Sequence, residues 1–287
     1  MRRTIPYRYG VILLMAALAL PACQEVIDIE LDTTYRRLVV FGTVTTDSLH
    51  HQVRLSTTSD YFSNQPAPAV SDALVELKMG ETVLRLEELD SVPGLYQTPV
   101  AFRGKPLTRY HLHISQVDVD NDGIFESYEA ETTMPVTPML DSIRLVYFQT
   151  PFFSGYQVFM FAMDSPEREW YGFKIWKNSD LLTDELSDYR VQSDDFVNGK
   201  YIYGLPVGFL TDSDPRQTLL PGDTVTLELN SIGEDFFDFI SDAQLEIMGN
   251  NPLFSGPSAN VHSNIGNNGI GIFTAYSLRS VSVIVRP

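Results

Sequence analysis

The sequence predicts a mainly β protein with two β-rich domains and one helix. Short runs of β-branched and aromatic residues recur along the chain, with turn signals at intervals of roughly 8–20 residues. Only residues 232–248 show the three- and four-residue apolar spacing of a long helix face. Pro135 and Pro138 interrupt the strand-rich sequence and favour a domain junction between the two halves. Hydrophobic residues make up 44% of the chain, which is enough for packed cores.

The segment 1–22 has the pattern of a signal peptide. Three arginines precede an apolar run from Val11 to Leu20, and this run is about half as long as a membrane-spanning helix requires. The only cysteine, Cys23, follows directly after Leu20-Pro21-Ala22. These residues resemble a bacterial lipobox, whose cysteine is acylated and becomes the first residue after cleavage. The resemblance implies a fatty-acid membrane anchor on Cys23, and a plain signal peptide with an incidental cysteine is the alternative.

Residues 23–35 are expected to form an acidic tether. Acidic residues soon after the cysteine resemble a surface-export signal of Bacteroidota lipoproteins, and a solvated linker is the alternative. The whole chain has a formal net charge of −17, which repels nucleic acid and anionic lipid headgroups. Because the sole cysteine is expected to be acylated, disulfides, thiol catalysis and cysteine metal sites are excluded.

Residues 36–135 predict a β-sandwich. Met79-Gly80-Glu81 lies between two alternating runs and is a hairpin signal. The succession Ala-x-Val-x-Leu, Gly-x-Tyr and Tyr-x-Leu-x-Ile resembles immunoglobulin-like (Ig-like) and transthyretin-like modules of the carboxypeptidase-regulatory type. The expected strands lie at residues 38–44, 51–56, 73–78, 82–86, 94–96, 108–114 and 128–133.

Residues 139–287 predict a C-terminal β-rich domain with one capped helix. Ser231-Ile232-Gly233-Glu234 is a capping-box pattern at the start of the helix predicted for residues 232–248. Acidic pairs such as Asp194-Asp195 are interpreted as surface charge. The expected strands lie at residues 143–148, 157–163, 170–176, 223–229 and 280–285.

The order of these features is similar to that of a Bacteroidota lipoprotein family catalogued as domain of unknown function 4249. A lipobox and an Ig-like module are followed by a strand with Trp170-Tyr171, a strand beginning Gly222-Asp223-Thr224-Val225, the capped helix and a last segment from Asn251 to Phe273. The last segment is the most specific part of the likeness. Members are usually found beside TonB-dependent outer-membrane transporters, and the family has no established activity. The resemblance therefore implies an outer-membrane location and a transporter partner, without implying any chemistry.

Residues 118–129 match the calcium-loop pattern D-x-[DN]-x-[DN]-G-x5-E at every specified position. Calcium binds about six to eight hard oxygens, and alternate carboxylates converge when the chain curls around the ion. Both flanks are predicted strands, so the loop would cap a β-hairpin and Glu129 could instead lie in the returning strand. The alternative is an acidic hairpin in which Asp and Asn only favour the turn. The expected ligands of a structural Ca²⁺ are Asp118, Asp120, Asp122, Glu126, Glu129 and the backbone carbonyl of Ile124.

Two segments are candidate ligand or partner surfaces. Aromatic residues concentrate around the Thr150-Pro151 turn, and core packing accounts for most of them. Phe152 and Phe153 fall in a loop, where exposed aromatic side chains commonly mark binding surfaces. The segment from Asn260 to Phe273 either threads the sandwich or contacts a ligand or transporter. The candidate binding residues are Phe152, Phe153, Tyr156, Asn260, Asn264 and Asn267.

These observations predict an outer-membrane-anchored lipoprotein that is a non-catalytic accessory or ligand-binding partner of a TonB-dependent transporter in nutrient uptake. The sequence contains no Gly-x-Ser-x-Gly elbow and no His-Glu-x-x-His motif. Two alternatives stay open: a structural or adhesive cell-surface lipoprotein, and an enzyme with a composite site in the C-terminal domain. The anchor is compatible with the cell surface and with the periplasmic face of the membrane.

Overall fold

A computed structural model shows one nine-stranded β-sheet with two smaller sheets, of four and three strands, within the residues that it describes. The predicted mainly β class with one helix is confirmed for these residues. The predicted signal peptide, Cys23, the whole of the tether and Asn260 lie outside them. The described residues are 36–59, 65–120, 122–195, 199–248 and 261–286.

The large sheet has the order β12-β11-β15-β16-β1-β2-β6-β5, and β13 also pairs with β11. Its strands are β1 (Leu38–Thr45), β2 (Gln52–Thr57), β5 (Glu87–Glu88), β6 (Leu95–Gln97), β11 (Trp170–Lys177), β12 (Asp180–Leu181), β13 (Arg190–Ser193), β15 (Thr224–Ile232) and β16 (Ile270–Ile284). The four-stranded sheet consists of β4 (Thr82–Arg85), β3 (Leu74–Met79), β7 (Arg109–Val117) and β8 (Glu126–Thr133). The three-stranded sheet consists of β14 (Tyr201–Thr211), β10 (Ser154–Met163) and β9 (Leu140–Gln149).

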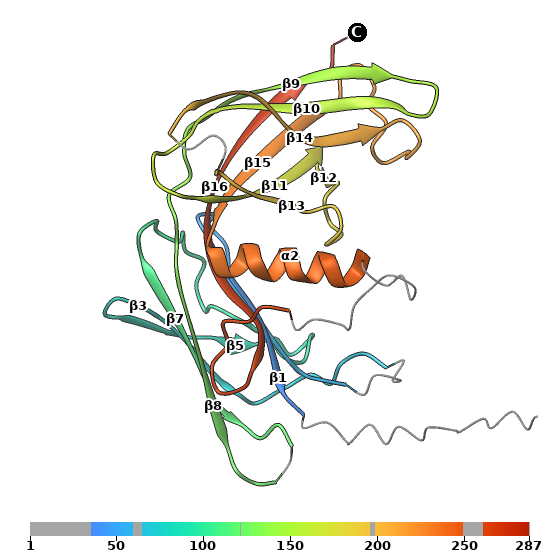
Figure 1. Ribbon diagram of the computed structural model, residues 1–287. Coiled ribbons are helices and arrows are strands. Elements are labelled where there is room, and N and C mark those ends of the chain that lie inside the picture. Colours follow the sequence, from blue (N-terminus) through green and yellow to red (C-terminus); the bar gives the residue numbers. More distant parts are fainter. Residues whose placement is uncertain (1–35, 60–64, 121, 196–198, 249–260, 287) are drawn as a thin grey trace, which may run out of the picture. The chain divides into compact units, whose positions relative to one another are not determined.

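Strand β16 lies at the centre of the large sheet (Figure 1). Its first half pairs in parallel with β1, and its second half pairs antiparallel with β15. The close approach to β1 requires glycine at position 271, where φ is +108° and an added Cβ would lie 2.0 Å from the carbonyl oxygen of Val40. An L side chain is disfavoured at such a φ, and no space exists for it. The pairing therefore joins strands from nearly opposite ends of the described chain.

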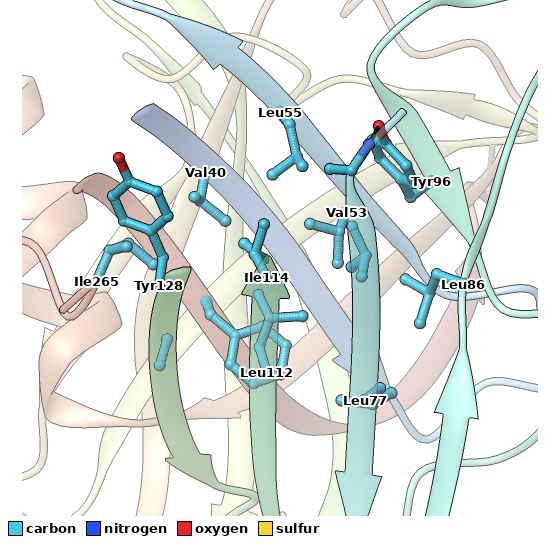
Figure 2. Packing of buried hydrophobic residues seen from close by; sticks show 14 of the residues in the cluster. Val40, Val53, Leu55, Leu77, Leu86, Tyr96, Leu112, Ile114, Tyr128 and Ile265 are labelled. Atoms are coloured by element: carbon cyan, nitrogen blue, oxygen red, sulfur yellow. Dashed lines mark hydrogen bonds between the residues drawn. The ribbon is translucent and has the colours of Figure 1, made fainter. Parts of the chain in front are cut away.

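The first core lies between the four-stranded sheet and the β1 side of the large sheet. Figure 2 shows Val40 of β1, Leu112 and Ile114 of β7, and Tyr128 of β8 in this cluster. Alternation explains their direction, since residues two apart in a strand point to the same side. Ile265, which lies in the segment just before β16, also belongs to this core.

The second core lies between the three-stranded sheet and the β15 side of the large sheet. Val158 and Met160 of β10 pack there with Phe173 of β11 and Leu227 of β15, and all four are almost fully buried. These alternating positions follow the strands predicted from sequence at 157–163, 170–176 and 223–229. The three-stranded sheet is thereby held to the large sheet by one of its faces.

One face of β16 serves both cores. Phe273 and Ala275 belong to the first core, whereas Val281 and Val283 pack against the second. All four are odd-numbered residues of one strand, so their side chains point to the same side of the sheet. The two small sheets therefore lie side by side over one face of the large sheet. The sequence assigns residues 139–287 to a separate C-terminal domain, but Ile265, Phe273 and Ala275 of that range pack in the core of the N-terminal sandwich.

Helix α2 (Glu234–Met248) packs on the opposite face of the large sheet (Figure 1). The ring of Phe239 meets the ring of Phe41 on β1, with centroids 5.9 Å apart. The ring of Phe236 stacks on Tyr276 of β16, with centroids 6.2 Å apart. Tyr276 is an even-numbered residue of β16, on the side away from Phe273. No helix in the described part of the chain is long and apolar enough to cross a membrane.

The predicted start of the helix is wrong by two residues. Ser231 and Ile232 remain in β15, where they pair with Tyr171 and Trp170 of β11. The Ser231 hydroxyl is buried without a hydrogen-bond partner among the described residues, so it does not cap the helix. Instead the amides of Phe236 and Phe237 donate to the carbonyl of Gly233. The sheet ladder outweighs the local capping-box signal at this position.

The dual role of β16 predicts a large loss of stability on replacing Phe273 by Ala. The side chain is 1% exposed, and truncating a buried Phe costs about 3–5 kcal/mol. Ile284→Ala in the same strand is the control, because Ile284 is 61% exposed and should cost about 1 kcal/mol or less. Urea unfolding of both variants measures the difference. Equal losses would contradict the place of β16 in the first core.

Candidate binding face and acidic loop

The outer face of the three-stranded sheet is the side turned away from the second core. On β10, Val158, Met160 and Ala162 point into the core, so Phe159 and Phe161 point outward between them. Cross-strand pairing brings β9 and β14 residues beside these positions, as in the pairing of Phe161 with Tyr203. This alternation gathers aromatic side chains from three strands on one surface.

We refer to this surface, with the turn at its edge, as the outer aromatic face. Several of its rings are largely exposed: Phe152 by 94%, Tyr203 by 84% and Phe153 by 54%. Single exposed apolar residues are common, but contiguous apolar patches mark interaction surfaces. The outer aromatic face comprises Phe148 on β9, Phe152 and Phe153 in the β9–β10 turn, Phe159 and Phe161 on β10, and Tyr203 and Phe209 on β14.

A shallow hollow of about 570 Å³ lies in the outer aromatic face. The rings of Phe153 and Phe209 meet edge to face at its wall, with centroids 5.6 Å apart. The side-chain amide of Gln157 donates to the carbonyl of Gly208 over 2.6 Å, which fixes a polar group among the rings. Mostly apolar walls with a few fixed polar groups are typical of binding sites. The lining residues are Phe148, Phe153, Gln157, Phe209 and Thr211.

The β9–β10 turn holds its two phenylalanines in place through one hydroxyl group. The Thr150 Oγ1 accepts hydrogen bonds from the amides of Phe152 and Phe153 at 3.3 and 3.0 Å. The Thr150 amide also donates to the carbonyl of Phe153 over 2.9 Å. Phe152 and Phe153 take part in these bonds through their backbone groups only, so the phenyl rings are not needed to hold the turn. The predicted exposure of Phe152 and Phe153 is confirmed.

The other candidate binding residues lie elsewhere. Tyr156 points toward the second core, and its ring centroid lies 5.0 Å from that of Tyr147. Asn264 accepts from the Phe273 amide and donates to the Phe273 carbonyl, at 3.0 and 2.8 Å. Asn267 has a φ of +52° and donates to the carbonyl of Ser127 over 3.0 Å. These bonds tie Asn264 and Asn267 to the sandwich, in agreement with a segment that threads it.

The acidic loop connects β7 to β8. Carboxylate oxygens of Asp118, Asp120 and Asp122 lie within 4.8 Å of one another. Asp118 accepts hydrogen bonds from the amides of Asp122 and Gly123 at 3.1 and 3.0 Å, which curl the loop. Asp122 accepts from the Ile124 amide over 2.7 Å. The three aspartates are therefore brought together as the sequence pattern predicts, and their oxygens suit a hard cation.

The structure does not bring the two glutamates to the aspartates as ligands. Glu126 begins β8, and its Oε2 accepts from the Val119 amide over 3.3 Å. Glu129 lies within β8 opposite His113, with its carboxylate 3.7 Å from Nε2 of His111. Strand pairing fixes the direction of the Glu129 side chain, so this expected bidentate ligand lies outside the group of three aspartates. Calcium binding stays a prediction, carried by the three aspartates.

Sequence reasoning missed the contribution of β14 and one buried acid. Tyr203 and Phe209 belong to a strand in which Gly204, Pro206 and Gly208 interrupt the alternation. The only available signal was the short run Tyr-Ile-Tyr at its start. The interpretation of Asp194 as surface charge is wrong, because this residue is 1% exposed. Its sequence neighbour Asp195 is exposed.

Removing one carboxylate from the acidic loop should weaken calcium binding. Asp120→Asn lowers the negative charge that would hold the ion, so affinity should fall by about tenfold or more. Glu129→Gln is the matched control, because Glu129 lies beside His111, and it should bind like the wild type. Calorimetric titration with Ca²⁺ in the absence of competing divalent ions measures both. No heat from the wild type, or equal loss in the two variants, would contradict this geometry.

Comparison with protein families identifies one domain, whose function is not known. Residues 24–281 match the domain of unknown function DUF4249. No curated protein sequence matches the chain. Because the match extends over most of the described strands and the helix, the chain belongs to the family defined by this domain of unknown function.

Proposed function

We propose that this protein is a lipid-anchored, non-catalytic binding protein that works with a TonB-dependent transporter in the outer membrane of a Bacteroidota cell. The lipobox-like Leu20-Pro21-Ala22-Cys23 supports the anchor. Family membership supports the transporter, since the resemblance noted above associates such proteins with TonB-dependent uptake. The observation that carries the binding role is the outer aromatic face.

The energetics of the outer aromatic face favour a partner. Apolar surface left in water forgoes about 25 cal/mol for each Å² that could be buried. Aromatic residues are enriched in the centres of interfaces, where truncating one commonly costs more than about 1 kcal/mol. The hollow between Phe153 and Phe209 has the size of a small ligand or of one or two inserted side chains. The face thus offers both an anchor pocket and a surrounding apolar rim.

The charge of the surface limits what this partner can be. The chain has a net charge of −17, so anionic membranes and nucleic acids are repelled from it. The outer aromatic face itself carries Arg144, whose guanidinium lies 5.0 Å from the centroid of the Phe161 ring. A cation over an aromatic ring keeps its charge while covering apolar area. A protein surface with exposed apolar side chains, or an uncharged ligand, matches this combination.

The anchor is tested by Cys23→Ser. A serine hydroxyl is not the thiol that a lipobox cysteine supplies, so the variant should carry no fatty acid and should leave the membrane fraction. Metabolic labelling with a fatty-acid analogue, followed by fractionation of cells, measures both properties. A Cys23→Ser protein that still takes up label would overturn the proposed anchor.

The binding role is tested at the β9–β10 turn. Phe152→Ser combined with Phe153→Ser removes two exposed rings but keeps the hydrogen bonds of the turn, which use Thr150 and the backbone. Co-purification of a TonB-dependent transporter with the full chain from solubilised outer membranes should fall about fivefold or more. Thermal stability should stay near that of the wild type.

The matched control is Phe125→Ser in the acidic loop. Phe125 is 70% exposed, so it offers a similar ring on a different hairpin. The proposal fails if the control loses the transporter as fully as the double variant. It also fails if the double variant retains the transporter at the wild-type level.

A further inference from the structure

A cluster of three carboxyl groups and one phenol lies where the three-stranded sheet meets the large sheet. Asp164 follows β10, Glu169 precedes β11, Tyr171 lies in β11, and Asp194 follows β13. Asp164, Asp194 and Tyr171 are each less than 5% exposed. Charged groups are rarely buried without a partner of opposite sign, because desolvation penalises the charged form.

Hydrogen-bond counting at Tyr171 shows that the cluster is short of hydrogen atoms when every carboxyl group is ionised. The Tyr171 hydroxyl oxygen lies 2.7 Å from Oδ1 of Asp164 and 2.5 Å from Oε2 of Glu169. A phenol has one hydrogen, so it can donate to only one of these oxygens. The other contact is a hydrogen bond only when the carboxyl group carries a proton and donates to the phenol oxygen.

Among the other carboxylate oxygens of the cluster, one oxygen of Asp194 lacks a hydrogen-bond donor. Oδ2 of Asp164 accepts from the Gly199 amide over 2.9 Å, so this carboxylate keeps a donor whichever way the Tyr171 hydrogen points. Oδ2 of Asp194 accepts from the Glu169 amide over 3.0 Å. Oδ1 of Asp194 is buried and has no donor among the described residues. The negative charge of Asp194 is therefore incompletely compensated beside Glu169.

No described cation neutralises the cluster through an ion pair. Arg168 lies next in sequence to Glu169, but its guanidinium pairs with Asp195 at 3.3 Å and lies over the Trp170 ring. Lys200 is exposed and contributes its backbone carbonyl, which accepts from the Asp164 amide. The charged and titratable groups that face Glu169 are Asp164 from the end of β10, Glu167 and Arg168 from the connection to β11, Tyr171 from β11, and Asp194 and Asp195 from the end of β13.

We propose that this cluster is a proton-binding site, in which protonated Glu169 donates to the Tyr171 oxygen and Tyr171 donates to Asp164. The bound proton completes a chain of hydrogen bonds from β11 to the end of β10. It thereby fastens the three-stranded sheet, with its outer aromatic face, to the large sheet. This inference does not depend on the proposed function.

The titration of Glu169 sets the direction of the pH effect. Burial is the largest cause that raises the pKa of Glu169, and the carboxylates of Asp164, Asp194 and Glu167 raise it further against the hydrogen bond from Tyr171. Burial likewise raises the pKa of Asp194. An acid whose pKa is raised by folding stabilises the protein below its unfolded pKa, and this stabilisation is lost as pH rises through the folded pKa. The junction should therefore loosen toward alkaline pH.

Glu169→Gln tests the proposal, since the Gln amide can donate to Tyr171 at every pH. The free energy of unfolding of the full chain, purified in detergent with EDTA, is measured from about pH 5 to about pH 9. The wild type should lose stability with rising pH more steeply than the variant, by a slope of up to about one proton. Glu167→Gln is the control for removing a nearby exposed acid, and it should keep most of the wild-type slope.

Carbon-13 NMR of labelled glutamate carboxyl groups gives a second measurement that does not require a stable variant at every pH. The resonance lost in Glu169→Gln should titrate above the ordinary range of glutamate. Titration at or below that range, or equal pH slopes in the wild type and Glu169→Gln, would overturn the proposal. Ca²⁺ can also be added at alkaline pH to the Asp120→Asn variant, whose acidic loop is weakened. If Ca²⁺ then restores stability to the wild-type level, the proposal is overturned, because the carboxyl cluster would bind a metal ion.

Discussion

The pairing of β16 with β1 is the constraint on which the rest of the structure depends. Because β16 also pairs with β15, it turns two groups of strands into one sheet. Its odd-numbered side chains then enter both cores, and its even-numbered side chains support α2 on the other face. Each small sheet buries one face against this frame. The three-stranded sheet is left with an aromatic face outward.

The local residue pattern was sufficient to predict the fold class and most strands, because alternation and turn residues act over a few positions. It identified the exposed turn at Phe152 and the aspartates at Asp118 for the same reason. The local pattern failed where pairing between strands that are distant in sequence determines the structure. Ser231 stays in β15 because of two neighbouring strands, and Glu129 turns toward His111 because β8 begins before it.

The carboxyl cluster illustrates the limit of sequence reasoning. Asp164, Glu169 and Asp194 are separated by other acids that lie at the surface, and nothing local distinguishes them. Their burial follows from the way β10, β11 and β13 end at one junction. The outer aromatic face has a similar origin, since Tyr203 and Phe209 join it only through the pairing of β14 with β10. Sites built from several strands thus require the fold to be known first.

The position of β16 also governs the timing of folding. Chains emerge from the ribosome with their N-terminal end first, so β1 is complete long before its central partner has been made. Until β16 arrives, β1 has only β2 beside it, and the first core lacks Phe273. Joining strands so far apart in sequence requires loop closure before any contact compensates for it, which slows folding. The large sheet can therefore close only after the last described strand of the chain has been synthesised.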